Sequence, residues 1–280
     1  MLNITKKDLT KIKEPLRYTG GEYGEVIKNE SEIQIRVALC YPNLYDIGMN
    51  NYTTMYLYSL LNSKKGIYAE RFFMPDLDIE KLLINNNQNL FSLETKKEMN
   101  CFDFAIFVLH DEIEYINVAC MLKLSKINNK DSKRPIIIGM IDNFEFKHCN
   151  LDNIFDIFVY GNKSVIYNDI LFRYGVYKSQ KLSISDYLYS INSIENVVVP
   201  CIDSNKKIEI ENKSQRKIQD EKIFPMIPVS NISSINQRLN IKYNSNILKL
   251  YQDIIKLIKN TGITNLNFID VTNDYTSMLM

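Results

Sequence analysis

The sequence lacks the long apolar segments and the excess of one charge that mark several classes of protein. No stretch approaches about 18 uncharged apolar residues, the length that spans a bilayer, and the N-terminal MLNITKKDLTKIKEP lacks the apolar core of a signal peptide. Lys and Arg number 34 against 33 for Asp and Glu, a net charge of +1. We therefore expect a cytoplasmic protein that uses neither a membrane nor a large basic surface for nucleic acid.

The cysteine and glycine patterns of common metal and nucleotide sites are also missing. The cysteines are widely spaced and form no C-x-x-C pair, which disfavours a zinc knuckle or a redox dithiol. Neither G-x-G-x-x-G nor G-x-x-x-x-G-K-[ST] occurs, so we expect no glycine-rich loop around nucleotide phosphates. The five cysteines, expected to be reduced thiols, are Cys40, Cys101, Cys120, Cys149 and Cys201.

What the sequence does contain, from about residue 30 to 175, is an alternation of apolar strands and helical segments. The longest uncharged apolar strand is Phe104–Leu109. Strand, helix and strand in this rhythm predict a doubly wound, Rossmann-like α/β fold with a parallel sheet and Phe104–Leu109 at its centre. The predicted strands are Ile33–Leu39, Tyr68–Phe73, Phe104–Leu109, Pro135–Ile138 and Ile154–Tyr160; the predicted helices are Asn51–Asn62, Asp76–Leu83, Ile113–Leu124 and Ser164–Phe172.

After Tyr174 the pattern becomes less regular. A short helix at Ser183–Ser190 and a strand at Glu195–Val199 precede a polar stretch without periodicity. Ser245–Lys259 has the apolar spacing of an amphipathic helix, and Leu266–Ile269 has the composition of a strand. A lone helix–strand unit has no sheet of its own, so we expect it to dock on the first domain or to belong to a second one.

Doubly wound sheets bind ligands at the carboxyl ends of their strands. His110-Asp111-Glu112 directly follows the strongest predicted strand, and it could supply an acid–base group or a metal ligand. The plainer interpretation, which we prefer, is a histidine that ends a strand and acidic residues that favour a helix N-terminus. The segments expected to form the binding crevice are Tyr41–Gly48, His110–Tyr115, Gly139–Asn143 and Gly161–Ser164.

Four segments of roughly the first 125 residues form an ordered set of motifs. They are RYTGGEYGEVIKNESEIQIRVALCYPNLYDIGMNN, AERFFMPDLDIEKLL, LFSLET and DFAIFVLHDEIEYINVACML. Together they resemble the N-terminus of radical S-adenosylmethionine proteins that carry a cobalamin-binding-type domain ahead of the radical barrel. The resemblance is faint from 195 to 240. It returns in the predicted helix–strand unit that ends in TGITNLNFIDVTNDYT, which is similar to the first helix and second strand of that barrel.

This resemblance implies a cofactor site at the strand ends. Cobalamin is the cofactor that it allows, and the family is also expected to hold a four-iron cluster and S-adenosylmethionine. Glu112, Tyr115 and Asn117 stand where the group has the same residue types. The residues expected to bind a cofactor, from the predicted crevice and the resemblance together, are Tyr45, Gly48, His110, Glu112, Tyr115, Asn117, Gly139 and Gly161.

Departures from the family pattern weaken the expectation of a cofactor. Gly139-Met140 replaces a Gly-Gly pair, and GNKS at Gly161 replaces a G-D-G-E-E-like turn, although a flat cofactor needs the close backbone approach that glycine permits. No D-x-H-x-x-G offers an axial ligand to cobalt. C-x-x-x-C-x-x-C, whose thiolates hold three irons of a four-iron cluster, is absent. We therefore predict no cluster, no S-adenosylmethionine cleavage, no catalytic residue and no metal site in this chain.

The expected domain division follows from the pattern and the resemblance. It comprises an N-terminal extension (1–30), a cobalamin-binding-like α/β domain (31–178), a linker or hairpin region (179–235) and a truncated start of a radical barrel (236–280). The preferred function is a degenerate family member that serves as a binding or interaction module, or a gene remnant. One alternative is a subunit whose cluster-bearing half lies on a separate radical-barrel chain. Another is an unrelated small-molecule-binding α/β domain that shares only the architecture.

Overall fold

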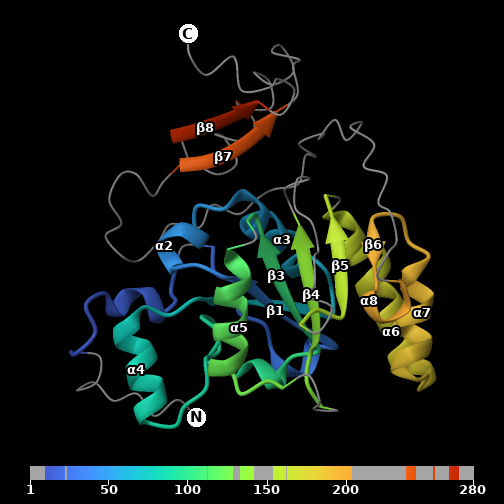
Figure 1. Ribbon diagram of the computed structural model, residues 1–280, viewed down its shortest axis with the longest axis horizontal. Helices are drawn as coiled ribbons and strands as arrows, with labels where there is room; N and C mark the ends of the chain where they lie inside the picture. Colours follow the sequence, from blue (N-terminus) through green and yellow to red (C-terminus); the bar gives the residue numbers. More distant parts are fainter. Residues whose placement is uncertain are drawn as a thin grey trace.

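A six-stranded sheet forms the centre of the protein, as the computed structural model shows (Figure 1). The strand order is β2-β1-β3-β4-β5-β6, and all neighbours are parallel except β5 and β6. The strands are β1 (Ile35–Tyr41), β2 (Ile67–Phe73), β3 (Phe104–Leu109), β4 (Ile136–Ile141), β5 (Ile157–Tyr160) and β6 (Val197–Val198). The structure describes residues 10–22, 24–111, 113–128, 133–141, 154–161, 163–203, 238–243, 255 and 265–270.

Helices cover both faces of this sheet (Figure 1). Side chains of α3, α6 and α7 pack with one set of strand residues, and those of α4 and α5 pack with the alternate set. The helices are α2 (Tyr45–Gly48), α3 (Tyr52–Asn62), α4 (Leu77–Asn85), α5 (Glu114–Leu124), α6 (Phe172–Gln180), α7 (Ile184–Asn192) and α8 (Pro200–Asp203). Shorter turns are η1 (Pro15–Tyr18), η2 (Glu30–Glu32), η3 (Met99–Cys101) and the π-helical η4 (Ile166–Leu171).

The alternation of strand side chains explains this two-layer core. In β3, Phe104, Ile106 and Val108 face the α3 side, whereas Ala105, Phe107 and Leu109 face the α5 side. Because both faces are buried, the strand is apolar throughout, as central parallel strands are. The predicted Rossmann-like α/β fold and the central place of Phe104–Leu109 are therefore confirmed.

Side chains define where three helices begin. Asn51 Oδ1 accepts a hydrogen bond from the Thr54 N–H at 2.8 Å and caps α3. Asp76 caps α4 by accepting from the Leu77 N–H. A capping box between Ser183 and Asp186 begins α7.

Two boundaries differ from those that the sequence predicts. Strand β4 continues to Ile141, so Gly139 and Met140 lie inside the strand and not in the turn after it. The sheet also continues past residue 178, where the α/β domain was expected to end. Helix α7 packs its buried Tyr187 and Ile191 on the core, and β6 pairs with β5, because this short strand buries valines on both faces.

The remaining strands form a separate parallel pair, β7 (Arg238–Tyr243) and β8 (Asn265–Asp270). Strand β8 coincides with the predicted Leu266–Ile269, but the expectation that it has no sheet partner is wrong, because all six residues of β7 pair with it. The polar linker and nearly all of the predicted helix Ser245–Lys259 lie outside the described residues. Within the described part of the chain, no helix combines the length and the apolar character needed to cross a membrane.

Candidate functional site

The sheet order creates a topological switch point between β1 and β3. The chain moves from β1 to β2 on one side and then returns to β3 on the other side. In open α/β sheets of this kind, the connections diverge at the carboxyl ends of such a strand pair, and ligands bind there. We call the residues that meet at this place, Tyr41, Asn51, His110 and Asn117, the switch-point edge.

His110 is the central side chain of the switch-point edge. It follows β3 directly, and its ring lies edge-on to that of Tyr41 at the end of β1, with centroids 5.9 Å apart. Its Nε2 atom contacts Nδ2 of Asn51, the N-cap of α3. The His110 backbone N–H donates to Glu114 Oε2 at 2.7 Å, and burial raises the pKa of Glu114. The plainer interpretation of a strand-end histidine before a helix thus describes its local structure.

Two of the other predicted residues also reach the carboxyl edge. Asn117 on α5 donates from Nδ2 to the Pro42 carbonyl oxygen at 2.8 Å, which joins the connections after β1 and β3. Gly161 follows β5 with φ of +66°, a left-handed conformation that favours glycine, and its N–H donates to the Ile141 carbonyl. Glu112 lies outside the described residues.

Four further predicted residues lie among packed side chains. Tyr45 is buried and donates from its hydroxyl to Glu22 Oε1 at 2.9 Å, on the β2 side of the sheet. At Gly48, the position that a Cβ atom would take is occupied by the rings of Phe73 and Tyr41. Tyr115 is buried on α5, with its ring centroid 5.8 Å from that of Phe155. Since Gly139 lies inside β4, a Cβ there would come within 2.8 Å of Phe158.

A buried ionic cluster that was not predicted from the sequence lies at the outer edge of the sheet. Arg71 on β2 has no exposed side-chain surface and donates to Glu94 Oε1 from Nε at 2.6 Å and to Glu22 Oε2 from Nη2 at 2.9 Å. Its guanidinium also lies 4.8 Å from the ring centroid of Tyr58. Burial alone would lower the pKa of Arg71, but Glu94 and Glu22 raise it, so the charge is retained.

This cluster also closes the outer edge of β2. The Arg71 N–H donates to Glu94 Oε2 and the Arg71 carbonyl accepts from the Leu93 N–H. Two residues earlier on the same edge, Asn62 Oδ1 accepts from the Ala69 N–H, and Asn62 Nδ2 donates to the Ala69 carbonyl oxygen, both at 3.0 Å. Polar groups that would otherwise form an open strand edge are thereby satisfied. The signal in the sequence was the charged pair in YAERFF, which interrupts an otherwise apolar strand.

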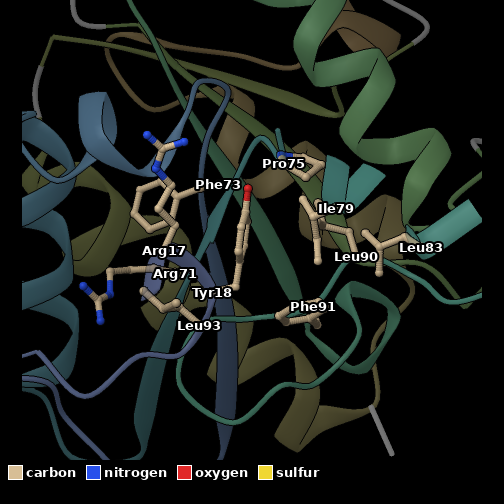
Figure 2. Close-up of a pocket in the computed structure, with 10 residues that line it drawn as sticks. All are labelled: Arg17, Tyr18, Arg71, Phe73, Pro75, Ile79, Leu83, Leu90, Phe91 and Leu93. Carbon is tan, nitrogen blue, oxygen red and sulfur yellow. The ribbon is translucent and has the colours of Figure 1, made fainter. Parts of the chain in front are cut away.

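A small cavity of about 20 Å³ lies near the end of β2, room for about one water molecule. Figure 2 shows Tyr18 standing across it, with the Arg71 guanidinium pointing away. The Tyr18 hydroxyl accepts a hydrogen bond from the Asp76 N–H at 3.0 Å, and burial raises its pKa to about 12. Arg17 next to it pairs with Asp46 and Asp76. The residues that line the cavity are Arg17, Tyr18, Arg71, Phe73, Pro75, Ile79, Leu83, Leu90, Phe91 and Leu93.

The described cysteines lie on separate elements: Cys40 in β1, Cys101 in η3, Cys120 in α5 and Cys201 in α8. Burial raises the pKa of Cys40 well above its usual value, which disfavours the thiolate that metals bind. Among the residues that the structure describes, no three histidine, cysteine or acidic side chains group as a metal site would require. Cys149 lies outside them.

The sheet order and the switch point define a Rossmann-like α/β domain. Residues 53–200 match the family model described as "Radical SAM proteins, N-terminal". This match covers more than half of the chain. The chain therefore belongs to that family, and the alternative of an unrelated α/β domain is wrong. A comparison with curated protein sequences gives no match.

The packing of Gly139 leads to a direct test. We expect Gly139→Ala to reduce the free energy of unfolding by about 1–3 kcal/mol, because the new methyl group must displace the rings of Phe158 and Phe155. Gly175→Ala on α6 is the matched control, because its Cβ would meet nothing within 4 Å. Alanine is more favourable than glycine inside a helix by up to about 1 kcal/mol, so this variant should not be destabilised. Urea unfolding measures both; an unchanged stability for Gly139→Ala would show that this space is open.

Proposed function

We propose that this chain provides the N-terminal binding module of a radical SAM protein, with its ligand site at the switch-point edge, and that its described residues carry no radical chemistry. Two side-chain contacts carry the proposal: where the strand order reverses, His110 contacts Asn51, and Asn117 donates to the Pro42 carbonyl oxygen. These side chains come from the two connections that follow β1 and β3. Such convergence of polar groups is what a ligand site in this fold requires.

The residues present do not fit a corrinoid. A flat macrocycle needs close approach to the backbone at glycines, but the space beside Gly48 and Gly139 is filled by aromatic rings of this chain. Cobalt needs a lone pair from an axial ligand, and the Nε2 atom of His110 is in contact with Asn51. The ligand that we propose is therefore smaller than a corrinoid and binds without these two glycines.

The absence of radical chemistry is proposed from the thiols. A four-iron cluster with one open iron needs three thiolates that converge on it. Here Cys40 is fully buried in β1, and C-x-x-x-C-x-x-C is missing from the sequence. The chemistry of the family would then require a cluster held elsewhere.

A partner chain that carries the cluster is the second candidate. Ile113 and Ile116, next to the switch-point edge, are 71% and 67% exposed although they are apolar. A cluster-bearing radical barrel that docks there would cover them and approach the ligand. This candidate predicts that 5′-deoxyadenosine forms only after a radical-barrel polypeptide is added.

The ligand site can be located with small probes. In ¹H–¹⁵N spectra, titration with 2-propanol, phenol and imidazole should first shift the amides of Asn51, His110 and Asn117, because organic probes accumulate where apolar walls and polar groups meet. The amide of Tyr18, at the separate cavity, is the internal control. Probe effects centred on Tyr18, or spread evenly over the surface, would contradict the proposed site.

The chemical part of the proposal is tested by anaerobic reconstitution with iron, sulfide and hydroxocobalamin. After gel filtration, the absorption spectrum should show neither a cluster nor a corrinoid bound to the chain, and reduction with S-adenosylmethionine should release no 5′-deoxyadenosine. About four irons per chain with 5′-deoxyadenosine release, or a stoichiometric corrinoid, would overturn it.

A further inference from the structure

The contact between Asn51 and His110 has a defined hydrogen-bond polarity. Asn51 Oδ1 is occupied as the N-cap acceptor of α3: it accepts from the Thr54 N–H at 2.8 Å and the Thr54 hydroxyl at 3.0 Å. A backbone N–H can only donate, so the oxygen of the Asn51 amide must face Thr54. The amide nitrogen, Nδ2, therefore faces His110 Nε2.

An amide NH₂ donates and has no lone pair to accept with. His110 Nε2 must then be the acceptor, which requires that it carry no hydrogen. In a neutral imidazole the hydrogen then resides on Nδ1. The cap of α3 thus determines the tautomer of a histidine at the end of β3, 59 residues further along the chain.

We propose that His110 is a proton-sensitive element of the switch-point edge, compatible with Asn51 only as the neutral Nδ1–H tautomer. A proton from solvent that adds to the Nε2 lone pair creates a second N–H, which points at the N–H of Asn51. The hydrogen bond between α3 and the end of β3 is then replaced by a repulsive contact. Asn51 is the positioning residue of this device, and His110 is its sensor.

The groups around His110 determine the balance of the two states. Among the described residues, β1 contributes the Tyr41 phenol and α5 contributes the Glu114 carboxylate. The next residue in the chain, Asp111, adds a carboxylate that accepts from the Ile113 N–H. The carboxylates favour an imidazolium, but Glu114 is bound to the His110 backbone N–H. Helix α3 contributes the uncharged Asn51 and Thr54. Asn51 therefore opposes protonation, and acidification should weaken the edge at which we propose ligand binding; only this consequence rests on the proposed function.

The test is ¹⁵N NMR of the histidine ring in a chain with one histidine. The sequence has two, so His148→Gln leaves His110 alone. Near neutral pH we expect an unprotonated Nε2 and a protonated Nδ1. Asn51→Asp keeps the cap acceptor and replaces the donor by a carboxylate oxygen, so the hydrogen should move to Nε2. The pH midpoint of the His110 titration should then rise by about one unit, a tenfold change in protonation.

Two control variants separate hydrogen-bond polarity from charge and from folding. Asn43→Asp adds a carboxylate after β1 and keeps the acceptor used by the Leu44 N–H; it should raise the midpoint much less. Asn51→Ser retains a good helix cap and removes the amide donor, so the preference for the Nδ1–H tautomer should be lost while circular dichroism stays unchanged. An Nε2–H tautomer in the starting protein, or equal shifts in Asn43→Asp and Asn51→Asp, would overturn the proposal. Failure of the probe titrations alone would overturn only the proposed ligand site.

Discussion

The buried charge of Arg71 is the constraint on which the edge of this domain depends. A guanidinium without solvent contact is tolerated only when carboxylates and hydrogen bonds replace water. Glu22 and Glu94 provide these partners, from positions 49 residues before and 23 residues after Arg71. The N-terminal segment and the loop after α4 must therefore both close on β2 before the charge is satisfied.

Three of the sequence segments that resemble the radical family meet in this cluster. Glu22 belongs to RYTGGEY, Arg71 to AERFFMPD and Glu94 to LFSLET. In the structure, Glu94 satisfies the outer edge of β2, and Glu22 links the N-terminal segment to this strand. Ile12 and Glu22, which lie in the segment expected to be an N-terminal extension, are thus buried against the α/β domain. With β2 held, β1 lies beside the switch point, and His110 reaches Tyr41 and Asn51 across it.

Much of the sheet could be predicted because its strands are buried on both faces. Phe104–Leu109 is apolar at every position, and that pattern depends only on local sequence. Gly139 was misplaced because a glycine after three isoleucines resembles a turn, whereas here it makes room for Phe158. Strand β7 was overlooked although its apolar residues, Leu239, Ile241 and Tyr243, alternate with polar ones in the pattern of a half-buried strand.

The candidate site was predictable only in part, for a related reason. His110 stood out because it follows the strongest strand, and Asn117 because of the resemblance. Their partners could not be predicted, since Asn51 and Pro42 are distant in the chain and are brought close only by the 2-1-3 strand order. The Arg71 cluster could not be predicted for the same reason. A charged pair in a strand indicates a buried ionic cluster only when the residues that carry the opposite charges are known.

A double-mutant cycle between Arg71 and Glu94 tests most directly whether this cluster holds the edge together. Arg71→Met should cost about 3–5 kcal/mol in the free energy of unfolding, because two buried carboxylates lose their partner. Adding Glu94→Gln removes one of those carboxylates, so the double variant should be less destabilised than the sum of the single variants by about 1–3 kcal/mol. The pair Lys178–Asp103, whose ammonium is half exposed, is the reference cycle and should give a coupling below about 1 kcal/mol. Additive effects at Arg71 and Glu94, within about 0.5 kcal/mol, would contradict the account.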